Sequence, residues 1–160
     1  MCSIFGIASK IKINTSLFEK SAKLMTHRGP DHYGSWESKD KNLILSSSRL
    51  ALNDLSSNGH QPMSDHTDKY KIVFNGEIYN FKSLKKELLK NNSKFINNSD
   101  TEVILEGYKL WGIDTLLKKI RGMYAFSLID QENNKLFLAR DAHGQKPLFY
   151  FFDNNHLIFS

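Results

Sequence analysis

Residues 123–160 read MYAFSLIDQENNKLFLARDAHGQKPLFYFFDNNHLIFS, and this stretch decides the fold class. It contains four apolar runs, MYAFSLID, KLFLAR, KPLFYFF and HLIFS, which are separated by turns rich in Asn, Asp and Gly. Short apolar runs punctuated by such turns are typical of consecutive β-strands. The sequence therefore predicts a strand-rich C-terminal part.

Two or three helices are expected before this stretch, and two of them have clear signals. The first places its apolar face at helical spacing, on Phe81, Leu84 and Leu88. The second begins at Ser99, which is expected to cap the N-terminus while Glu102 reaches back to it in a capping box. The apolar stripe of this second helix is formed by Ile104, Tyr108 and Trp111, and Gly112 is expected to end it.

The N-terminal part alternates between strands and one helix. Residues 2–8 and 43–52 are predicted strands, and a helix with a capping box from Ser16 to Glu19 is expected to stop before Gly29-Pro30. A further strand over residues 70–74 is expected to end at the turn signal Asn75-Gly76. This order favours antiparallel sheets with helices on their outer faces.

Composition and charge exclude several classes of protein. The chain of 160 residues is 40% hydrophobic and 24% charged, as expected for one soluble globular domain. Its net charge of +5 is scattered, so we expect no nucleic-acid partner. No apolar run approaches the roughly 20 residues that cross a bilayer, and the single cysteine suits a reducing compartment. We therefore expect a cytoplasmic protein that does not bind membranes.

Cys2 is the only cysteine and follows the initiator methionine. Removal of Met1 would place the Cys2 thiol and a free α-amine on one residue. That amine has a reference pKa of about 7.7–8.0 and could accept the thiol proton, as N-terminal nucleophiles require. Taken alone, however, a single cysteine is more often a small core residue.

Three other features are ambiguous when taken alone. Arg49, near the end of an apolar strand, suits either an ion pair or a bidentate grip on a substrate carboxylate. Asn75-Gly76-Glu77 is either a tight turn or a source of oxyanion donors. Asp100 is either a favourable acid in the first turn of a helix or a partner for a substrate ammonium.

Metal and serine chemistry have little support. The six histidines, at positions 27, 32, 60, 66, 143 and 156, form no HxxEH pattern and have one cysteine to join them, so we expect no metal site. A GxSxG nucleophile elbow is absent from the sequence.

Together these motifs resemble one family along the whole chain. The chain is similar to the class II, N-terminal nucleophile glutamine amidotransferase domain of glutamine-dependent asparagine synthetases. The resemblance is carried, in order, by MCSIFGI, HRGPD, SRLAL, QPM, FNGEIYNF, SDTEVIL, RGMYAF and LARDAHGQKPLFY. It implies an α+β fold, the four-layer αββα sandwich of two antiparallel sheets between helical layers.

The resemblance also implies a role for each ambiguous residue. Cys2 would attack the side-chain amide of glutamine, form a glutamyl thioester and release ammonia, while Asn75 and Gly76 would supply the oxyanion hole. Arg49 would bind the α-carboxylate of glutamine. The remaining substrate contacts would come from Leu50, Leu52, Asn53, Glu77 and Asp100. Arg28, in HRGPD, is expected to be structural.

This sequence departs from the family pattern at several points. Asn53 stands where an aliphatic residue is expected, and His143 and Gln145 stand where an aromatic and an aliphatic residue are commoner. The family continues beyond HLIFS, so we expect residues 1–160 to be an amidotransferase domain that is incomplete at its C-terminus. The ATP-dependent synthetase domain, and with it ATP and Mg, is expected outside this sequence, in cis or in trans.

Three interpretations remain open at this point. The first is the glutaminase part of an asparagine synthetase, with no cofactor for the glutaminase step and a possible homodimer. The second is an amidotransferase that serves another acceptor, such as a sugar phosphate or phosphoribosyl compound, although FNGEIYN argues against it. The third is a non-catalytic module that binds amino acids or assembles with a synthetase. It predicts loss of Cys2, Asn75 or Arg49, which are all present.

Overall fold

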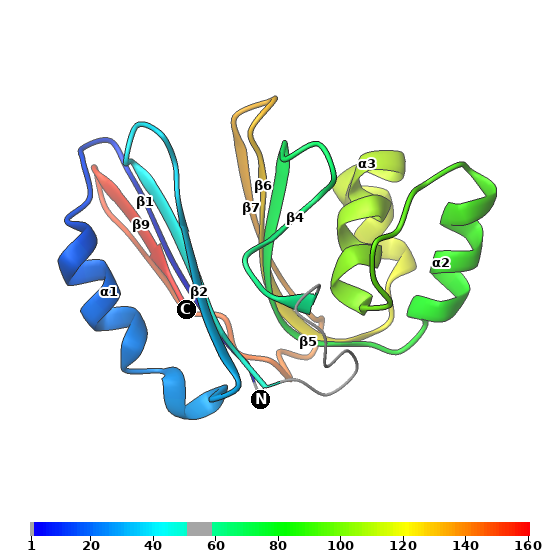
Figure 1. The fold of residues 1–160 in the computed structure, drawn as a ribbon, viewed down its shortest axis with the longest axis horizontal. Coiled ribbons are helices and arrows are strands. Elements are labelled where there is room, and N and C mark those ends of the chain that lie inside the picture. Colours follow the sequence, from blue (N-terminus) through cyan, green and yellow to red (C-terminus); the bar gives the residue numbers. More distant parts are fainter. Residues whose placement is uncertain (1, 51–58) are drawn as a thin grey trace.

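The computed structural model describes residues 2–50 and 59–160 and places two antiparallel sheets face to face (Figure 1). Sheet A has the order β2-β3-β1-β9-β8. Its strands are β1 (Ser3–Ser9), β2 (His32–Glu37), β3 (Leu43–Arg49), β8 (Tyr150–Phe152) and β9 (His156–Phe159). Sheet B has the order β4-β5-β6-β7. Its strands are β4 (Met63–Ser64), β5 (Tyr70–Ile78), β6 (Gly122–Asp130) and β7 (Lys135–Arg140).

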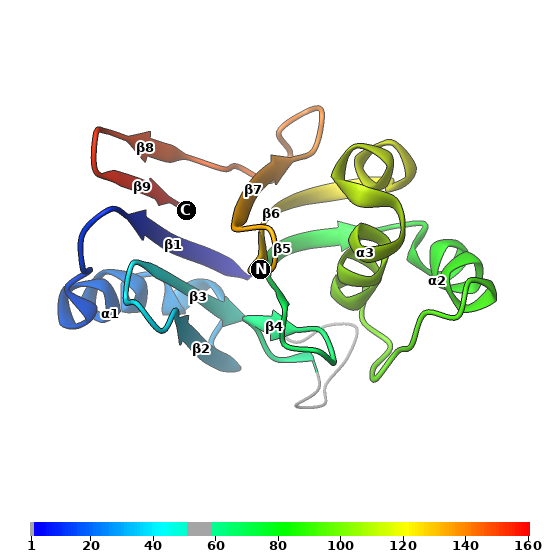
Figure 2. The same cartoon turned by 90° about the horizontal axis from the view of Figure 1, so that it is seen from above.

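Helices cover the outer face of each sheet. Helix α1 (Thr15–Lys23) and the 3₁₀ turn η1 (Thr26–Arg28) lie on the outer side of sheet A. Helices α2 (Phe81–Lys90) and α3 (Asp100–Lys119) lie on the outer side of sheet B, as Figures 1 and 2 show. The predicted α+β architecture with four layers is confirmed.

A core between the two sheets fixes their relative position. It consists of buried residues from both sheets: Ile4, Leu45, Val73, Ala125, Ile129 and Phe159. Gly6 of β1 lies directly against the Phe159 ring, since a Cβ there would be 2.2 Å from Cζ of that ring. A larger side chain at position 6 would therefore displace β9 or separate the sheets.

The N-terminal helix begins two residues earlier than the sequence predicts. Asn14, not Ser16, is the N-cap, because its side chain accepts a hydrogen bond of 3.0 Å from the Leu17 backbone N–H. Glu19 does not complete a capping box, since it accepts a hydrogen bond from the Tyr33 hydroxyl instead. The predicted stop before Gly29-Pro30 is confirmed, because helical structure ends with η1.

The predicted turn at Asn75-Gly76 is wrong. Strand β5 continues through these residues to Ile78 and pairs with β6 along its whole length, with Asn75 opposite Ala125 and Gly76 opposite Tyr124. A paired neighbouring strand overrides the local turn preference of Asn-Gly. Gly76 is required here for closeness, since a Cβ would lie 2.2 Å from the Met123 carbonyl oxygen.

Helix α3 begins with Ser99 as its N-cap, as predicted, but Glu102 does not complete the capping box. The Ser99 hydroxyl accepts the Glu102 N–H at 3.2 Å, while the Glu102 carboxylate binds the backbone N–H groups of Ile96 and Asn97 and does not return to Ser99. Gly112 interrupts the helix with φ +74°, as the sequence indicates, and a second helical segment follows. No helix among the described residues is long and apolar enough to span a membrane.

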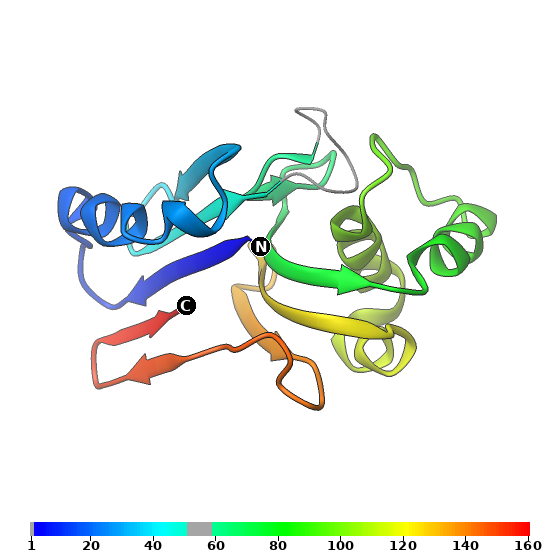
Figure 3. The same cartoon turned by 90° about the horizontal axis from the view of Figure 1, so that it is seen from below.

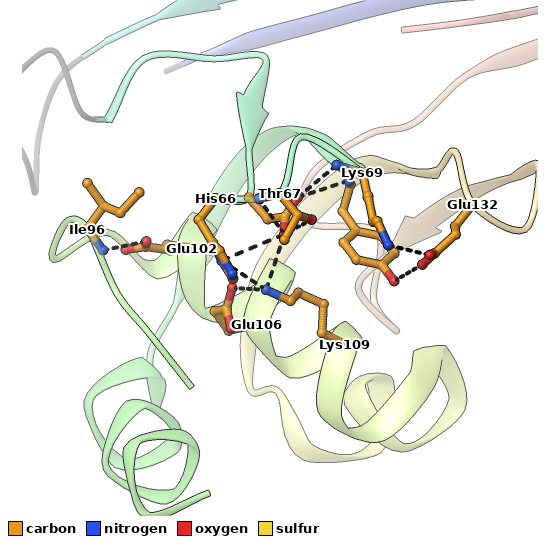
Figure 4. A network of polar contacts seen from close by, with 10 residues as sticks. His66, Thr67, Lys69, Ile96, Glu102, Glu106, Lys109 and Glu132 are labelled. Atoms are coloured by element: carbon orange, nitrogen blue, oxygen red, sulfur yellow. Dashed lines mark hydrogen bonds and ion pairs between the residues drawn. The ribbon is translucent and has the colours of Figure 1, made fainter. Parts of the chain in front are cut away.

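A polar network ties α3 to the turn before β5 (Figure 4). Lys109 of α3 bridges two carboxylates, Glu106 at 2.7 Å and Asp65 at 3.2 Å. Asp65 in turn accepts the backbone N–H groups of Thr67, Lys69 and Tyr70. These contacts hold the middle of α3 against the segment that leads into β5.

Candidate active site

One cavity of about 130 Å³ opens where the two sheets and the start of α3 meet. Figure 3 shows the beginning of β1, in dark blue, beside β5 at this junction. The lining brings together Cys2, Arg49, Leu50, Asn75, Gly76, Glu77 and Asp100, all of them site residues in the sequence prediction. Leu52 and Asn53 lie outside the described residues. The remaining lining residues are Gly59, Gln61, Phe74, Ser99, Thr101, Met123 and Lys146.

Cys2 stands immediately before β1 and is partly exposed to the cavity. Its thiol lies 3.8 Å from the Leu50 carbonyl oxygen and can donate to it. The Arg28 guanidinium donates through Nε to the Cys2 carbonyl oxygen at 3.3 Å. Arg28 therefore has a positional role next to Cys2, which is more specific than the structural role expected from HRGPD.

Arg49 is the last residue of β3 and is 7% exposed. Gly59 packs against its guanidinium, because a Cβ on Gly59 would lie 2.4 Å from Nη2. The β3 ladder fixes the backbone of Arg49, and the close approach of Gly59 limits the space around its fork of donors. Such a fork is suited to a carboxylate.

The edge of β5 that points away from β6 supplies backbone donors. N–H groups of a strand point alternately to its two edges. Phe74 N donates to Gln61 Oε1 at 2.7 Å, and Ile78 N donates to Asp100 Oδ2 at 2.9 Å. Gly76 is two positions from each of these residues, so its N–H points to the same edge of the strand and toward the cavity.

The hydrogen bonds of the paired strand β6 support this orientation of the Gly76 N–H. Tyr124, which faces Gly76 across the ladder, donates its N–H to Asp141 Oδ2 at 3.1 Å and accepts Asp141 N–H at 2.8 Å. The pair of Gly76 and Tyr124 is therefore a non-hydrogen-bonded pair of the antiparallel ladder. The N–H of Gly76 is consequently left for the cavity side.

Asp100 is the buried acid of the site, with 5% of its surface exposed. Burial raises the pKa of Asp100 above its ordinary value, and the nearby charge of Glu77 acts in the same direction. Hydrogen bonds from backbone N–H groups, that of Ile78 among them, partly oppose this increase. A cation bound next to Asp100 would favour its ionised form.

Gln61 and Lys146 are two of the seven lining residues that the sequence prediction did not assign to the site, although both lie in motifs that the sequence shows. Gln61, in QPM, is 5% exposed and joins the halves of the site, accepting Phe74 N–H and donating to the Thr101 hydroxyl at 3.4 Å. Lys146, in LARDAHGQKPLFY, is also buried and lines the cavity. Their roles depend on contacts between sequence-distant elements, which motif spacing does not reveal.

Asp141 holds the loop that carries Lys146. Its two carboxylate oxygens accept the backbone N–H groups of four residues, namely Tyr124, His143, Gln145 and Lys146. These bonds lower the pKa of Asp141 against the effect of its burial. The loop conformation thus depends on Asp141, and His143 and Gln145 take part through their backbones.

The cavity combines a thiol, a backbone donor, two basic side chains (Arg49 and Lys146) and two acids. A substrate that carries both a carboxylate and an ammonium would find a partner of opposite charge for each in Arg49 and in Asp100 with Glu77. The thiol of Cys2 and the N–H of Gly76 then remain for a third group of that substrate. The arrangement suits nucleophilic attack on a carbonyl of an amino acid. No cluster of three or more metal-ligating side chains occurs within residues 2–50 and 59–160.

Comparison with known proteins points to the same chemistry. A family model described as "Glutamine amidotransferase domain" matches residues 1–160. The chain is 37% identical to asparagine synthetase B [glutamine-hydrolyzing] of Escherichia coli, covering 97% of this chain and 28% of that protein. It is 34% identical to asparagine synthetase [glutamine-hydrolyzing] 1 of Bacillus subtilis, covering 100% of this chain and 26% of that protein.

A solved structure shares the fold. It is a glutamine phosphoribosylpyrophosphate amidotransferase from B. subtilis in complex with ADP and GMP, with a TM-score of 0.81 at 19% identity. The alignment covers 99% of this chain and 41% of that one. The chain spans about a fifth to a third of the length of the curated relatives that it matches.

Proposed function

The chain belongs to the glutamine amidotransferase domain family, and from this premise we propose that it hydrolyses glutamine to glutamate and ammonia with Cys2 as nucleophile. The observation that carries the proposal is the joint placement of Cys2, Arg49, Gly76 and Asp100 around one cavity. The same residues were each ambiguous in the sequence. Their convergence from different elements matches the three functional groups of glutamine.

The nucleophilic step uses the first residue of the mature chain. After removal of Met1, the α-amine of Cys2 accepts the thiol proton, and the thiolate sulfur attacks the side-chain amide carbon of glutamine. Collapse of the tetrahedral intermediate breaks the C–N bond and forms a thioester, and the amine returns the proton to the departing ammonia. Water then gives a proton to the amine and attacks the thioester carbon, the C–S bond breaks, the sulfur takes the proton back as the Cys2 thiol, and glutamate is released. An amine with a pKa near 8 is suited to these proton transfers.

Hydrogen-bond donors on β5 stabilise the negative charge that develops on the oxygen of the glutamine side-chain amide. The N–H of Gly76 and the side-chain amide of Asn75 serve as oxyanion donors. Both residues belong to a paired strand, so little reorganisation accompanies the reaction. Gln61 and Asp100, which bind the N–H groups on either side of Gly76, support this part of the strand.

Recognition of the amino-acid end uses opposite charges. Arg49 binds the α-carboxylate, and Asp100 with Glu77 binds the α-ammonium. Ionised Asp100 is buried, so its pairing with the ammonium offsets the cost of burying its charge. Leu50, with Leu52 and Asn53 of the segment that follows, is proposed to complete the pocket.

We further propose that the ammonia serves an ATP-dependent amidation, with aspartate as the acceptor. The relatives named above are glutamine-hydrolysing asparagine synthetases, and they are much longer than this chain. ATP and Mg would bind in the synthetase part, in the same polypeptide or in a partner. The glutaminase step itself is proposed to need no cofactor.

The test compares wild-type protein with Cys2→Ala, after mass spectrometry has shown that Met1 is removed. Release of glutamate is expected from wild type and is expected to disappear in Cys2→Ala, with an unchanged circular dichroism spectrum. Glutamate release that survives the substitution would overturn the assignment.

A second comparison tests the amine as base. A short peptide extension in front of Cys2 converts the amine into a peptide bond, so glutamine hydrolysis is expected to be lost. Cleavage of the extension at a protease site directly before Cys2 should restore activity in the same sample. Full activity before cleavage would show that another group takes the thiol proton.

A further inference from the structure

His32 and His60 form a face-to-face pair beside the proposed carboxylate subsite. Their ring centroids lie 3.5 Å apart and their planes are inclined by 12°. His32 is the first residue of β2, whereas His60 follows Gly59 in the short segment that leads to β4. The stack therefore joins β2 of sheet A to the segment before β4.

The same segment touches β2 at a second point. A Cβ on Gly34 would lie 2.1 Å from the Gln61 carbonyl oxygen, so the two backbones are in direct contact there. Contacts at both His60 and Gln61 fix the direction of the short run from Gly59 to Gln61. Gln61 then continues to sheet B through its bond to Phe74 N–H.

Arg49 depends on this segment. In the β2–β3 ladder Arg49 is the partner of His32, and its guanidinium lies against Gly59, with no room there for even a methyl group. The residue that follows Gly59 is His60, whose ring rests on His32. Movement of the His60 ring would thus shift Gly59, the residue against which the Arg49 guanidinium packs.

The position of His32 is not explained by its own hydrogen bonding. Its Nδ1 is buried and has no hydrogen-bond partner among the described residues. Burial, the neighbouring His60 and the charge of Arg49 lower the pKa of His32, in this order. The ring is therefore neutral at neutral pH, and a neutral flat ring can stack at this distance without charge repulsion.

We propose that the His32–His60 stack is a positioning device for Arg49 that sets the affinity for the α-carboxylate of glutamine. The proposal rests on the function proposed above. Cys2, directly before β1, and Gly76, on β5, take no part in this contact, so the stack acts on binding and leaves the chemical step unchanged.

The test measures KM and kcat for glutamine hydrolysis at pH 7.5 in His60→Ala. KM is expected to rise about tenfold with kcat within about twofold of wild type. His60→Phe keeps a flat ring and is expected to stay near the wild-type KM, whereas His60→Leu, which keeps volume without a flat ring, is expected to resemble His60→Ala. His156→Ala, at the far end of sheet A, serves as control and should change neither constant.

A double-mutant cycle assigns the effect to Arg49. In an Arg49→Lys background, which removes the fork, His60→Ala is expected to add little to KM. A full tenfold increase in that background, or an unchanged KM in both His60→Ala and His60→Leu, would overturn the positioning role. A loss confined to kcat with a lower melting temperature would also overturn it, since that pattern indicates a merely structural contact.

The two proposals fail in different ways. Absence of Cys2-dependent glutamate release from wild-type protein overturns the proposed function and this inference with it. Wild-type activity combined with a KM that does not respond to the stack overturns the inference alone.

Discussion

Sheets A and B meet at one cavity but are supported to different extents. The outer face of sheet B is covered by α2 and α3 over an extensive core that includes the fully buried Leu88, Ile104 and Leu105. The outer face of sheet A is covered by α1 and the short turn η1, with a small core around Phe18, Ala22 and Ile44. Its edge strand β8 and the preceding residue expose four consecutive aromatic residues, 149 to 152.

Each sheet supplies one chemical and one binding element of the proposed site. Cys2, directly before β1, and Arg49 belong to the sheet A side, while the Asn75-Gly76 donors and Asp100 come from sheet B and α3. The proposed oxyanion donors, Asn75 and Gly76, therefore lie on sheet B, which has the more extensive core. We therefore expect that opening of sheet A alone would separate the residues of the site while sheet B stays folded.

The largest expected effect comes from a substitution that weakens the smaller core, the one on sheet A. Phe18→Ala removes a side chain that is 1% exposed from the small core beneath α1 and is expected to cost about 3–5 kcal/mol of unfolding free energy. Hydrogen exchange should show loss of protection in β2 and β3 ahead of β5 and β6. Leu17→Ala, on the exposed side of the same helix, is the control. Equal loss in both sheets would show that they unfold as one unit.

The next effect tests the chemical role of sheet B. Asn75→Ala is expected to lower kcat by about 10²–10³-fold, the usual cost of one oxyanion donor, with little change in KM. Steady-state kinetics against Asn154→Ala, in the exposed turn before β9, gives the comparison. A loss that falls on KM and leaves kcat intact would move Asn75 from the chemical step to substrate binding.

A smaller effect separates function from stability at Asp100. Asp100→Asn is expected to raise KM for glutamine by about 10- to 100-fold, in line with a lost charged hydrogen bond. Its melting temperature should not fall at neutral pH, because the raised pKa of Asp100 means that its buried charge costs stability there. Thermal unfolding and kinetics on the same samples check both parts. A marked loss of stability would indicate that the charge supports the fold.

The smallest expected effect concerns pH and sheet A. The pKa of His32 is lowered from the ordinary 6.5, so its unfolded form binds a proton more readily. The stability contributed by neutral His32 is therefore complete above pH 6.5 and falls as the pH drops from 6.5 toward the folded pKa. Urea unfolding at pH 7.5 and 5.0 should show this loss, and His32→Phe should reduce the pH dependence. An identical dependence in both proteins would exclude His32 as its source.

Local sequence signals predicted most elements but not the contacts between them. The four C-terminal strands, the helix at Phe81 and the Ser99 cap follow from periodicity and capping, which are local properties. The turn at Asn75-Gly76 was wrong because pairing with β6 depends on residues some fifty positions away. The cap at Ser16 was wrong because Asn14 offered an equivalent side chain earlier.

The site was predicted chiefly through resemblance. Cys2, Arg49 and Asp100 were ambiguous as single residues, and only the ordered motifs joined them. Gln61, Lys146 and the His32–His60 stack were not assigned, since each acts through packing between sheets or loops. Such contacts depend on three-dimensional register, to which a single sequence gives no direct access.

The continuous strand at Asn75-Gly76 also has a consequence for how this domain can vary in evolution. Turns commonly tolerate inserted or deleted residues, but a one-residue change within a paired strand reverses the side on which every following side chain lies. In β5 the side chain of Phe74 packs toward the helices and that of Val73 toward sheet A. An insertion before Asn75 would turn its amide into the helical core. Length changes among descendants of this gene should therefore be found in connecting segments, while β5 keeps a fixed length.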